Sequence, residues 1–140
     1  MNPAVTIKYA HENLFECLKH KPIWEDGSGL SRYNLFTPRT VLEILNRVEV
    51  LISDQEKLRG FFPTGGLSGT FKSAYELDGG QAFVRAKTGT LRNMHLQSRW
   101  IDTRKGKTYR FVFMNNNFVR PTAEVRKEMV RIMTVIHENF

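Results

Sequence analysis

The sequence predicts a single α+β domain, residues 1–140, built from antiparallel strands with helices packed on them. Two observations predict this class. Apolar residues recur at helical spacing near both ends of the chain, whereas residues 83–114 alternate with the two-residue period of a strand. With 140 residues, of which 41% are hydrophobic and 25% charged, the chain is long enough to bury a real core.

Two helices are expected before residue 52. The first runs from Ile7 to Leu18 and is stopped by the Lys21-Pro22 pair. Its buried apolar face consists of Ile7, Ala10, Leu14, Cys17 and Leu18. The second begins at Thr37-Pro38, because threonine is a good N-cap and proline fits the first helical position. The apolar face of this second helix consists of Val41, Ile44, Leu45, Val48 and Leu51.

The rest of the chain is expected to form loops, three strands and a last helix. Residues 60–80 are rich in glycine and predict ordered loops. Short connections between the predicted strands, including a polar hairpin tip at residues 104–107, favour antiparallel pairing. The predicted strands are Phe83–Lys87, Met94–Trp100 and Arg110–Met114. The last helix begins at Pro121-Thr122, and its apolar stripe is expected to pack on the sheet. This stripe consists of Val125, Met129, Ile132, Met133 and Ile136.

Composition narrows the class of function. The net charge of +7 favours anionic partners, but the basic residues are spread along the chain, so a solvated surface is preferred and no nucleic acid is expected. A basic nucleic-acid-binding domain stays as the lesser alternative. Cys17 is the only cysteine and the four histidines are scattered, so neither a disulfide, a metal site nor a cofactor is expected.

Nothing in the sequence predicts membrane insertion or export. No apolar stretch is long enough to cross a bilayer. The first residues, Met1 to His11, lack the apolar region and cleavage site of a secretory signal. As written, the chain is therefore expected to stay in the cytoplasm.

Two motifs carry the chemistry, and the pair in this order is far more specific than either alone. The first is the run from Asp26 to Asn34, Asp-Gly-Ser-Gly-Leu-Ser-Arg-Tyr-Asn, and the second is Lys87-Thr88-Gly89. A lysine on a strand offers a fixed cation to a substrate carboxylate, and neighbouring threonine hydroxyls offer donors. Each motif also has a purely structural alternative. The first could be a loop in which Ser31 or Asn34 caps a helix, and Lys87 could be an ordinary solvated lysine.

These motifs, together with Gly66-Leu-Ser-Gly-Thr-Phe71 and Arg85-Ala-Lys-Thr-Gly-Thr-Leu91, resemble a known family. From about Asp26 to its end, the chain resembles the carboxy-terminal part of the class C low-molecular-mass penicillin-binding proteins. These are D-alanyl-D-alanine carboxypeptidases/endopeptidases of peptidoglycan metabolism. The resemblance implies the carboxy-terminal portion of a penicillin-binding protein/β-lactamase-like transpeptidase domain, located in the periplasm or elsewhere outside the cytoplasm. It also implies an acyl-serine mechanism, with peptidoglycan peptide as substrate and β-lactams as acylating ligands.

The resemblance also implies roles for individual residues. Ser31 and Lys87 match catalytic positions, with Lys87 also holding Ser31 in a proton relay. Asn34 matches the substrate amide ligand, although the family spacing is Ser-x-Asn and here Asn34 is the third residue after Ser31. Thr88, Gly89 and Thr90 match substrate-binding positions, and the Thr90 N–H is expected to supply half of an oxyanion hole.

The family's nucleophile motif is absent from these residues, because no serine is followed three positions later by lysine. Ser53 and Lys57 are one residue too far apart. The sequence therefore predicts a serine-type D-Ala-D-Ala carboxypeptidase fragment, with two of three active-site motifs, that is inactive alone. The alternative is a non-enzymatic module that binds cell-wall peptide or a protein. The expected partners are an amino-terminal half that carries the nucleophile, or a second copy joined at an open sheet edge beside Arg110–Met114.

Overall fold

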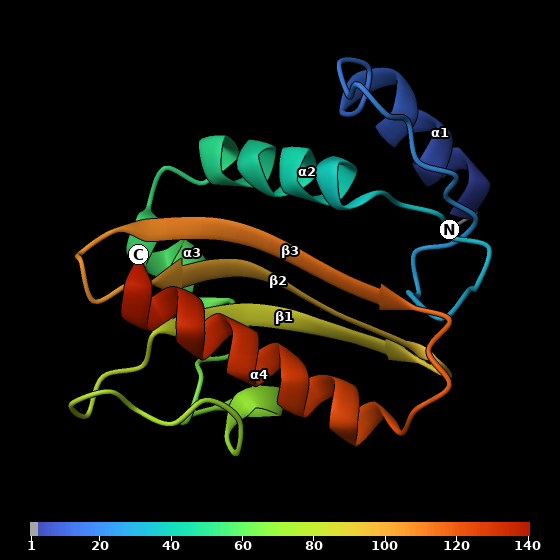
Figure 1. Ribbon diagram of the computed structural model, residues 1–140. Helices are drawn as coiled ribbons and strands as arrows, with labels where there is room; N and C mark the ends of the chain where they lie inside the picture. Colours follow the sequence, from blue (N-terminus) through green and yellow to red (C-terminus); the bar gives the residue numbers. More distant parts are fainter. Residues whose placement is uncertain (1–2) are drawn as a thin grey trace.

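The computed structural model describes residues 3–140 and shows a three-stranded antiparallel sheet with helices around it (Figure 1). The strands lie in the order β1-β2-β3 and are joined by tight turns. In chain order the elements are α1 (Pro3–Asn13), α2 (Pro38–Leu51), α3 (Gln55–Gly60), the 3₁₀ turn η1 (Gly69–Phe71), β1 (Val84–Leu91), β2 (Met94–Asp102), β3 (Thr108–Asn116) and α4 (Thr122–Asn139).

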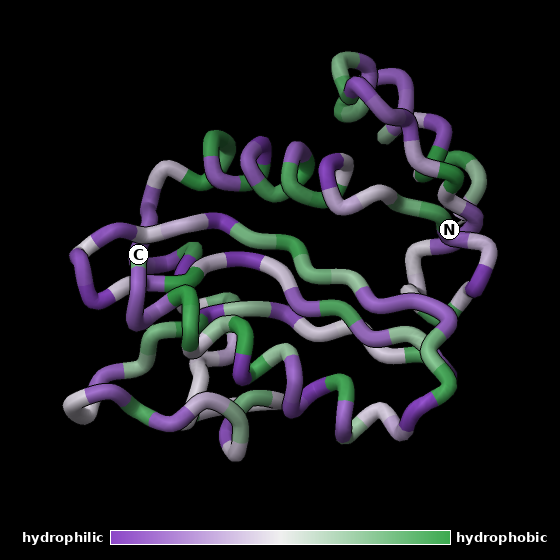
Figure 2. The backbone as a smooth tube through the Cα atoms, viewed as in Figure 1, coloured by the Kyte–Doolittle hydropathy of each residue, from purple (hydrophilic) through white to green (hydrophobic). Residues whose placement is uncertain are grey.

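Helices α2 and α4 cover the sheet, with α2 alongside β3 and α4 across β1 and β2 (Figure 1). Both helices mix hydrophobic and hydrophilic residues along their length, as Figure 2 shows, which is typical of helices with one buried side. Successive strand residues face opposite sides of a sheet. Val84 and Ala86 of β1 accordingly pack in the same core cluster as Met133 of α4, while Leu96 of β2 lines a cavity together with Val41 of α2.

The main core lies between the sheet and α4. Its fully buried members come from β1, β2, α4 and the loop before β1, and they exclude water from the strand that carries Lys87-Thr88-Gly89. This confirms that the apolar stripe of the last helix packs on the sheet. The core cluster consists of Phe71, Tyr75, Phe83, Val84, Ala86, Ile101 and Met133, with Phe111, Phe113, Val130 and Ile136 packed against it.

The predicted α+β class, the order of the elements and the antiparallel pairing are confirmed. Thr37 caps α2 as predicted, and its side chain accepts a hydrogen bond from the Thr40 N–H at 3.0 Å. Gly106 takes the positive φ of 75° expected at the tip of the β2–β3 hairpin.

The prediction for the first helix is wrong at both ends, because α1 spans Pro3–Asn13 and not Ile7–Leu18. The backbone leaves the helix where the Leu14 and Phe15 N–H groups both donate to the Ala10 carbonyl at 2.9 Å. Phe15 then packs against the ring of Trp24, with 5.9 Å between centroids. Cys17, which was expected on the buried face, is consequently exposed.

A charged cluster ties the end of α4 to the loop before β1. Asp78 accepts hydrogen bonds from Arg104 at 2.8 and 3.1 Å, and its Oδ2 lies 3.0 Å from His137 Nε2. His137 also stacks on Phe83, with 4.1 Å between ring centroids. The Arg104 hydrogen bonds, followed by that from His137, lower the pKa of Asp78 from 3.8 to about 2.

This cluster predicts a loss of stability in acid. A carboxylate whose pKa is lower in the folded than in the unfolded state stabilises the fold above its unfolded pKa. We therefore expect this contribution to be complete above about pH 5 and to disappear as the pH falls from 3.8 towards 2. Urea unfolding at pH 5 and at pH 2.5 measures it. Asp78→Asn should flatten the pH dependence in this window, and an unchanged dependence in that variant would contradict the assignment.

Within the described residues both edges of the sheet are largely unpaired, and no helix is suited to cross a membrane. Among residues 3–140, no strand pairs with the outer edge of β3, and β1 is covered only near Arg85, by a bridge to Thr64. None of the helices in the described part of the chain combines the length and apolarity needed to span a bilayer.

Candidate active site

The loop at residues 26–34 is held in shape by its own side chains. Asp26 Oδ1 accepts from the Ser28 N–H at 2.9 Å and from the Ser28 hydroxyl at 2.8 Å. The Ser28 hydroxyl bond is the main cause of the lowered pKa of Asp26. A bridge between Ile23 and Leu35, with N–O distances of 3.0 and 2.7 Å, closes the neck of the loop. This local network explains why the motif is rich in small polar residues.

Asn34 lies inside that network. Its side-chain Oδ1 accepts from the Glu25 N–H at 2.8 Å and from the Asp26 N–H at 3.2 Å, while its Nδ2 donates to the Asp26 carbonyl at 3.3 Å. The Ser31 hydroxyl accepts from the Tyr33 N–H at 3.2 Å. The amide of Asn34 is thus engaged in holding the loop, whereas the Ser31 hydroxyl makes one hydrogen bond among the described residues.

A long-range contact brings the loop to the sheet. The Arg32 guanidinium donates to the Arg92 carbonyl at 2.6 Å, in the turn between β1 and β2. This contact sets Ser31 and Asn34 opposite the end of β1. Residues of the loop and of the end of β1, more than fifty positions apart in the chain, therefore line one cavity.

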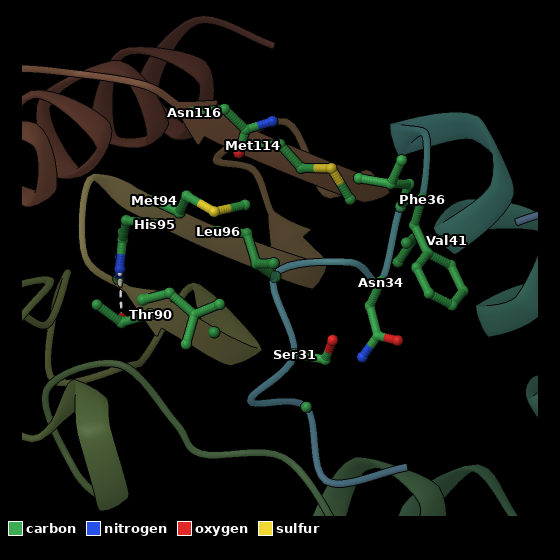
Figure 3. Close-up of a pocket in the computed structure, with 14 residues that line it drawn as sticks. Ser31, Asn34, Phe36, Val41, Thr90, Met94, His95, Leu96, Met114 and Asn116 are labelled. Atoms are coloured by element: carbon green, nitrogen blue, oxygen red, sulfur yellow. Dashed lines mark hydrogen bonds between the residues drawn. The ribbon is translucent and has the colours of Figure 1, made fainter. Parts of the chain in front are cut away.

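Between these walls lies a cavity of about 390 Å³. Figure 3 shows Ser31 and Asn34 on the loop at one side, and Thr90, hydrogen-bonded to His95, at the other. Polar residues thus lie at two sides of a largely apolar space. The lining residues are Gly29, Ser31, Asn34, Leu35, Phe36, Val41, Gly89, Thr90, Leu91, Met94, His95, Leu96, Met114 and Asn116.

The backbone of β1 offers hydrogen-bonding groups at its open edge. The Gly65 N–H donates to the Val84 carbonyl at 2.8 Å, and the Ala86 N–H donates to the Pro63 carbonyl at 3.0 Å, so the backbone of these residues points away from β2. Because this direction alternates along an antiparallel strand, the N–H groups of Thr88 and Thr90 point to the same edge. The Thr90 N–H therefore points to the edge of β1 that does not face β2.

Of the residues predicted from the second motif, Gly89 and Thr90 line the cavity, whereas Lys87 and Thr88 do not. Lys87 is exposed, and its Nζ donates to the Thr88 carbonyl. The Thr88 hydroxyl donates to Thr70 Oγ1 at 3.3 Å. A Cβ atom at Gly89 would lie 3.1 Å from two side-chain atoms of Leu96, which explains the glycine at this position.

A buried network of polar side chains that contacts Thr90 was not predicted from the sequence. His95 Nδ1 lies 2.8 Å from Thr90 Oγ1. The other ring nitrogen, His95 Nε2, lies 3.3 Å from Gln97 Nε2. His95 and Gln97, which alternate with Met94 and Leu96 along β2, are only 1% and 2% exposed. Desolvation, followed by the charge of Arg126, lowers the pKa of His95. The signal in the sequence was the proximity of a histidine to the second motif.

The structure also bears on the Ser53–Lys57 pair and on metals. Ser53 precedes α3, whose N-cap is Asp54, and the Lys57 N–H donates to Asp54 Oδ1 at 3.0 Å. Ser53 and Lys57 therefore do not face each other on one helix. Within residues 3–140 there is no group of three or more histidine, cysteine or acidic residues able to hold a metal ion.

The family model that describes the D-Ala-D-Ala carboxypeptidase 3 (S13) family matches residues 19–139 of this chain. Among curated proteins, the D-alanyl-D-alanine carboxypeptidase DacB of Haemophilus influenzae is 33% identical over 100 residues, which cover 69% of this chain and 20% of that protein. The penicillin-sensitive carboxypeptidase A of Dictyostelium discoideum is 34% identical over 67 residues, covering 47% of this chain and 13% of that protein. The matches thus span a fifth or less of these relatives.

Solved structures show the same fold. Penicillin binding protein 4 of Haemophilus influenzae, in complex with a β-lactam, superposes with a TM-score of 0.78 at 24% identity, covering 96% of this chain and 33% of that one. A second structure of that protein gives a TM-score of 0.76, covering 95% of this chain and 31% of the other.

Proposed function

This chain belongs to the D-Ala-D-Ala carboxypeptidase 3 (S13) family, and on that premise we propose that it forms two walls of a serine D-Ala-D-Ala carboxypeptidase/endopeptidase site. In this site the loop at residues 26–34 and strand β1 hold a peptide that ends in D-Ala. The single observation that carries the proposal is the cavity shared by Ser31, Gly89 and Thr90. We place this activity outside the cytoplasm, where peptidoglycan is its substrate and β-lactams are its acylating ligands.

Each residue has a distinct part in this proposal. The Thr90 N–H, at the open edge of β1, stabilises the oxyanion that forms when the scissile carbonyl is attacked. Lys87 and the hydroxyls of Thr88 and Thr90 hold the carboxylate of the terminal D-Ala, because a fixed cation and hydroxyl donors complement an anion. Ser31 transfers the proton within a relay that includes Lys87. Asn34 orients the substrate amide once its own hydrogen bonds to Glu25 and Asp26 are exchanged.

The nucleophile comes from a segment with Ser-x-x-Lys, which these residues do not contain. Two features support a partner at this position. The cavity is largely apolar, with Met94, Leu96 and Met114 in its wall, so a packed segment gains free energy by covering it. The outer edge of β3 is free of strands among residues 3–140, and an unpaired edge favours the addition of a strand.

Complementation tests the proposal. A separate protein segment that bears the family's Ser-x-x-Lys motif is mixed with this chain, and release of D-Ala from an acyl-D-Ala-D-Ala peptide is measured. We expect release from the mixture and none from either part alone. Sedimentation of the mixture reports whether the parts associate, and a stable complex without release would contradict the catalytic role of these residues.

A non-enzymatic binding module is the second candidate, and the absence of Ser-x-x-Lys favours it. In that case the cavity holds cell-wall peptide without cleaving it. Titration of the chain alone with the same peptide, followed by NMR at Ser31 and Lys87, separates the two functions. Binding with no release of D-Ala in the complemented mixture identifies the module.

A further inference from the structure

A continuous chain of buried hydrogen bonds ends at Thr90. The Tyr75 hydroxyl donates to Gln97 Oε1, and Gln97 Nε2 lies 3.3 Å from His95 Nε2. His95 Nδ1 then lies 2.8 Å from Thr90 Oγ1, which also accepts from Arg126 Nη2 at 3.4 Å. Tyr75, Gln97 and His95 are each at most 3% exposed, so water does not compete with these bonds.

The direction of donation along this series of hydrogen bonds is fixed at its buried end, by Tyr75. Burial raises the pKa of Tyr75, so its phenol keeps its proton and donates it to the acceptor that it touches, Gln97 Oε1. The amide nitrogen of Gln97 then faces His95 and can only donate. Neutral imidazole has one donor and one acceptor nitrogen. His95 Nε2 must therefore be the acceptor, and Nδ1 carries the hydrogen.

The Thr90 hydroxyl lies at the exposed end of these hydrogen bonds. Its oxygen accepts from His95 Nδ1 and from the Arg126 guanidinium, which has no acceptor of its own. Both lone pairs of the oxygen are then used, and neither neighbour can receive the hydroxyl hydrogen. This hydrogen must point away from both neighbours. Thr90 is exposed and lines the cavity, so the hydroxyl is available to a ligand there as a donor.

We propose that His95 is a positioning residue which, oriented by Tyr75 and Gln97, holds the Thr90 hydroxyl as an obligatory donor and so selects an anionic group, the carboxylate of the bound peptide, over a neutral amide. This inference rests on the proposed function for its ligand. A carboxylate can only accept at this position, whereas a carboxamide that turns its NH₂ towards Thr90 meets a second donor. The neutral state of His95 agrees with its lowered pKa, and the charged group that faces it is Arg126 of α4.

The first experiment reads the tautomer of His95 in the chain itself, by long-range ¹H–¹⁵N NMR at pH 7. We expect a protonated Nδ1 and a bare Nε2. Gln97→Leu, which removes the donor to Nε2, should abolish this preference. The opposite tautomer, or a charged ring, in the wild-type chain would overturn the proposal. This readout does not depend on catalysis or on peptide binding.

The second experiment compares an acetyl-D-Ala-D-Ala peptide with its C-terminal amide, each titrated into the chain and followed at the Thr90 N–H. We expect the acid to bind more tightly, and His95→Leu to reduce the ratio of the two affinities by roughly fivefold, the usual size of one hydrogen bond. His95→Asn is the matched control, because its amide nitrogen can take the place of Nδ1 and should restore the ratio.

Several outcomes separate this proposal from the proposed function. An acid-to-amide ratio that His95→Leu leaves unchanged, with both peptides bound, would overturn the role of His95 while the function stands. Failure of the wild-type chain to bind either peptide counts against the carboxylate as ligand and against peptide binding by this chain alone. In that case the tautomer still decides whether Thr90 is held as a donor.

Discussion

Replacing Glu49 with alanine should lower the free energy of unfolding by on the order of 3 kcal/mol, because it leaves a buried guanidinium without its ion partner. Arg99, whose side chain is 1% exposed, lies 3.9 Å from Glu49 and is stacked 3.8 Å from the ring centroid of Trp100. Its Nη1 donates to the Leu45 carbonyl at 2.8 Å, but its Nε and Nη2 have no hydrogen-bond partner among the described residues. Glu49 also binds Arg110 at 2.7 Å. The loss of one carboxylate therefore removes the ionic contacts of α2 with both β2 and β3.

A second variant shows whether the effect comes from the buried charge. Arg99→Met keeps an apolar stem over Trp100 and removes the charge, so Glu49→Ala should cost much less in that background than in the wild-type chain. Urea unfolding of the two single variants and the double variant measures this coupling. Glu76→Ala, at an exposed loop position, is the control for loss of a carboxylate. Equal losses for Glu49→Ala and Glu76→Ala would contradict the assignment.

Replacing Lys87 with alanine should slow acylation by a penicillin in the complemented mixture on the order of 30-fold, equivalent to about 2 kcal/mol, the usual value for a hydrogen bond to a charged group. Lys87 follows Ala86, which is buried in the core, so its backbone is held in place while its side chain is exposed. Its Nζ has only the Thr88 carbonyl to leave when a ligand carboxylate arrives, among the hydrogen bonds of the described chain.

Lys107→Ala is the matched control, because Lys107 is an exposed lysine in the turn between β2 and β3, at the other end of the sheet. We expect it to leave the acylation rate unchanged. Urea unfolding of both variants checks that neither substitution acts through stability. A loss of rate that is equal for Lys87→Ala and Lys107→Ala would show a general effect of net charge and not a site.

The fold could be predicted where the spacing of apolar residues matches the burial of those residues in the structure. Thr37-Pro38 begins α2 and the stripe with Met129 and Met133 packs on the sheet, because capping and amphipathic spacing act locally. The end of α1 could not be predicted in this way. Whether the helix continues past Asn13 depends on the packing of Phe15 against Trp24, a contact with a residue outside the helix.

The residues of the candidate site also differ in whether local sequence or long-range contacts determine their environment. Ser31 and Thr90 were named from their motifs, and both line one cavity, while their roles stay predictions. His95 and Gln97 could not, because polar residues that alternate with Met94 and Leu96 predict a solvent-facing side, whereas α4 and the loop with Tyr75 cover it. Arg99 likewise is buried under α2, with a φ of 152° that turns it out of the regular alternation. In each case a long-range contact decides the outcome.

The central claim is that this chain supplies two walls of the active site and that the nucleophilic serine lies on another segment. Covalent labelling by a fluorescent penicillin, read after denaturation, tests it most directly. The chain is labelled alone, and again after mixing with a segment that bears Ser-x-x-Lys. We expect no label on the chain in either sample, and label on the added segment only when the chain is present. A stoichiometric adduct on the chain by itself would contradict the claim.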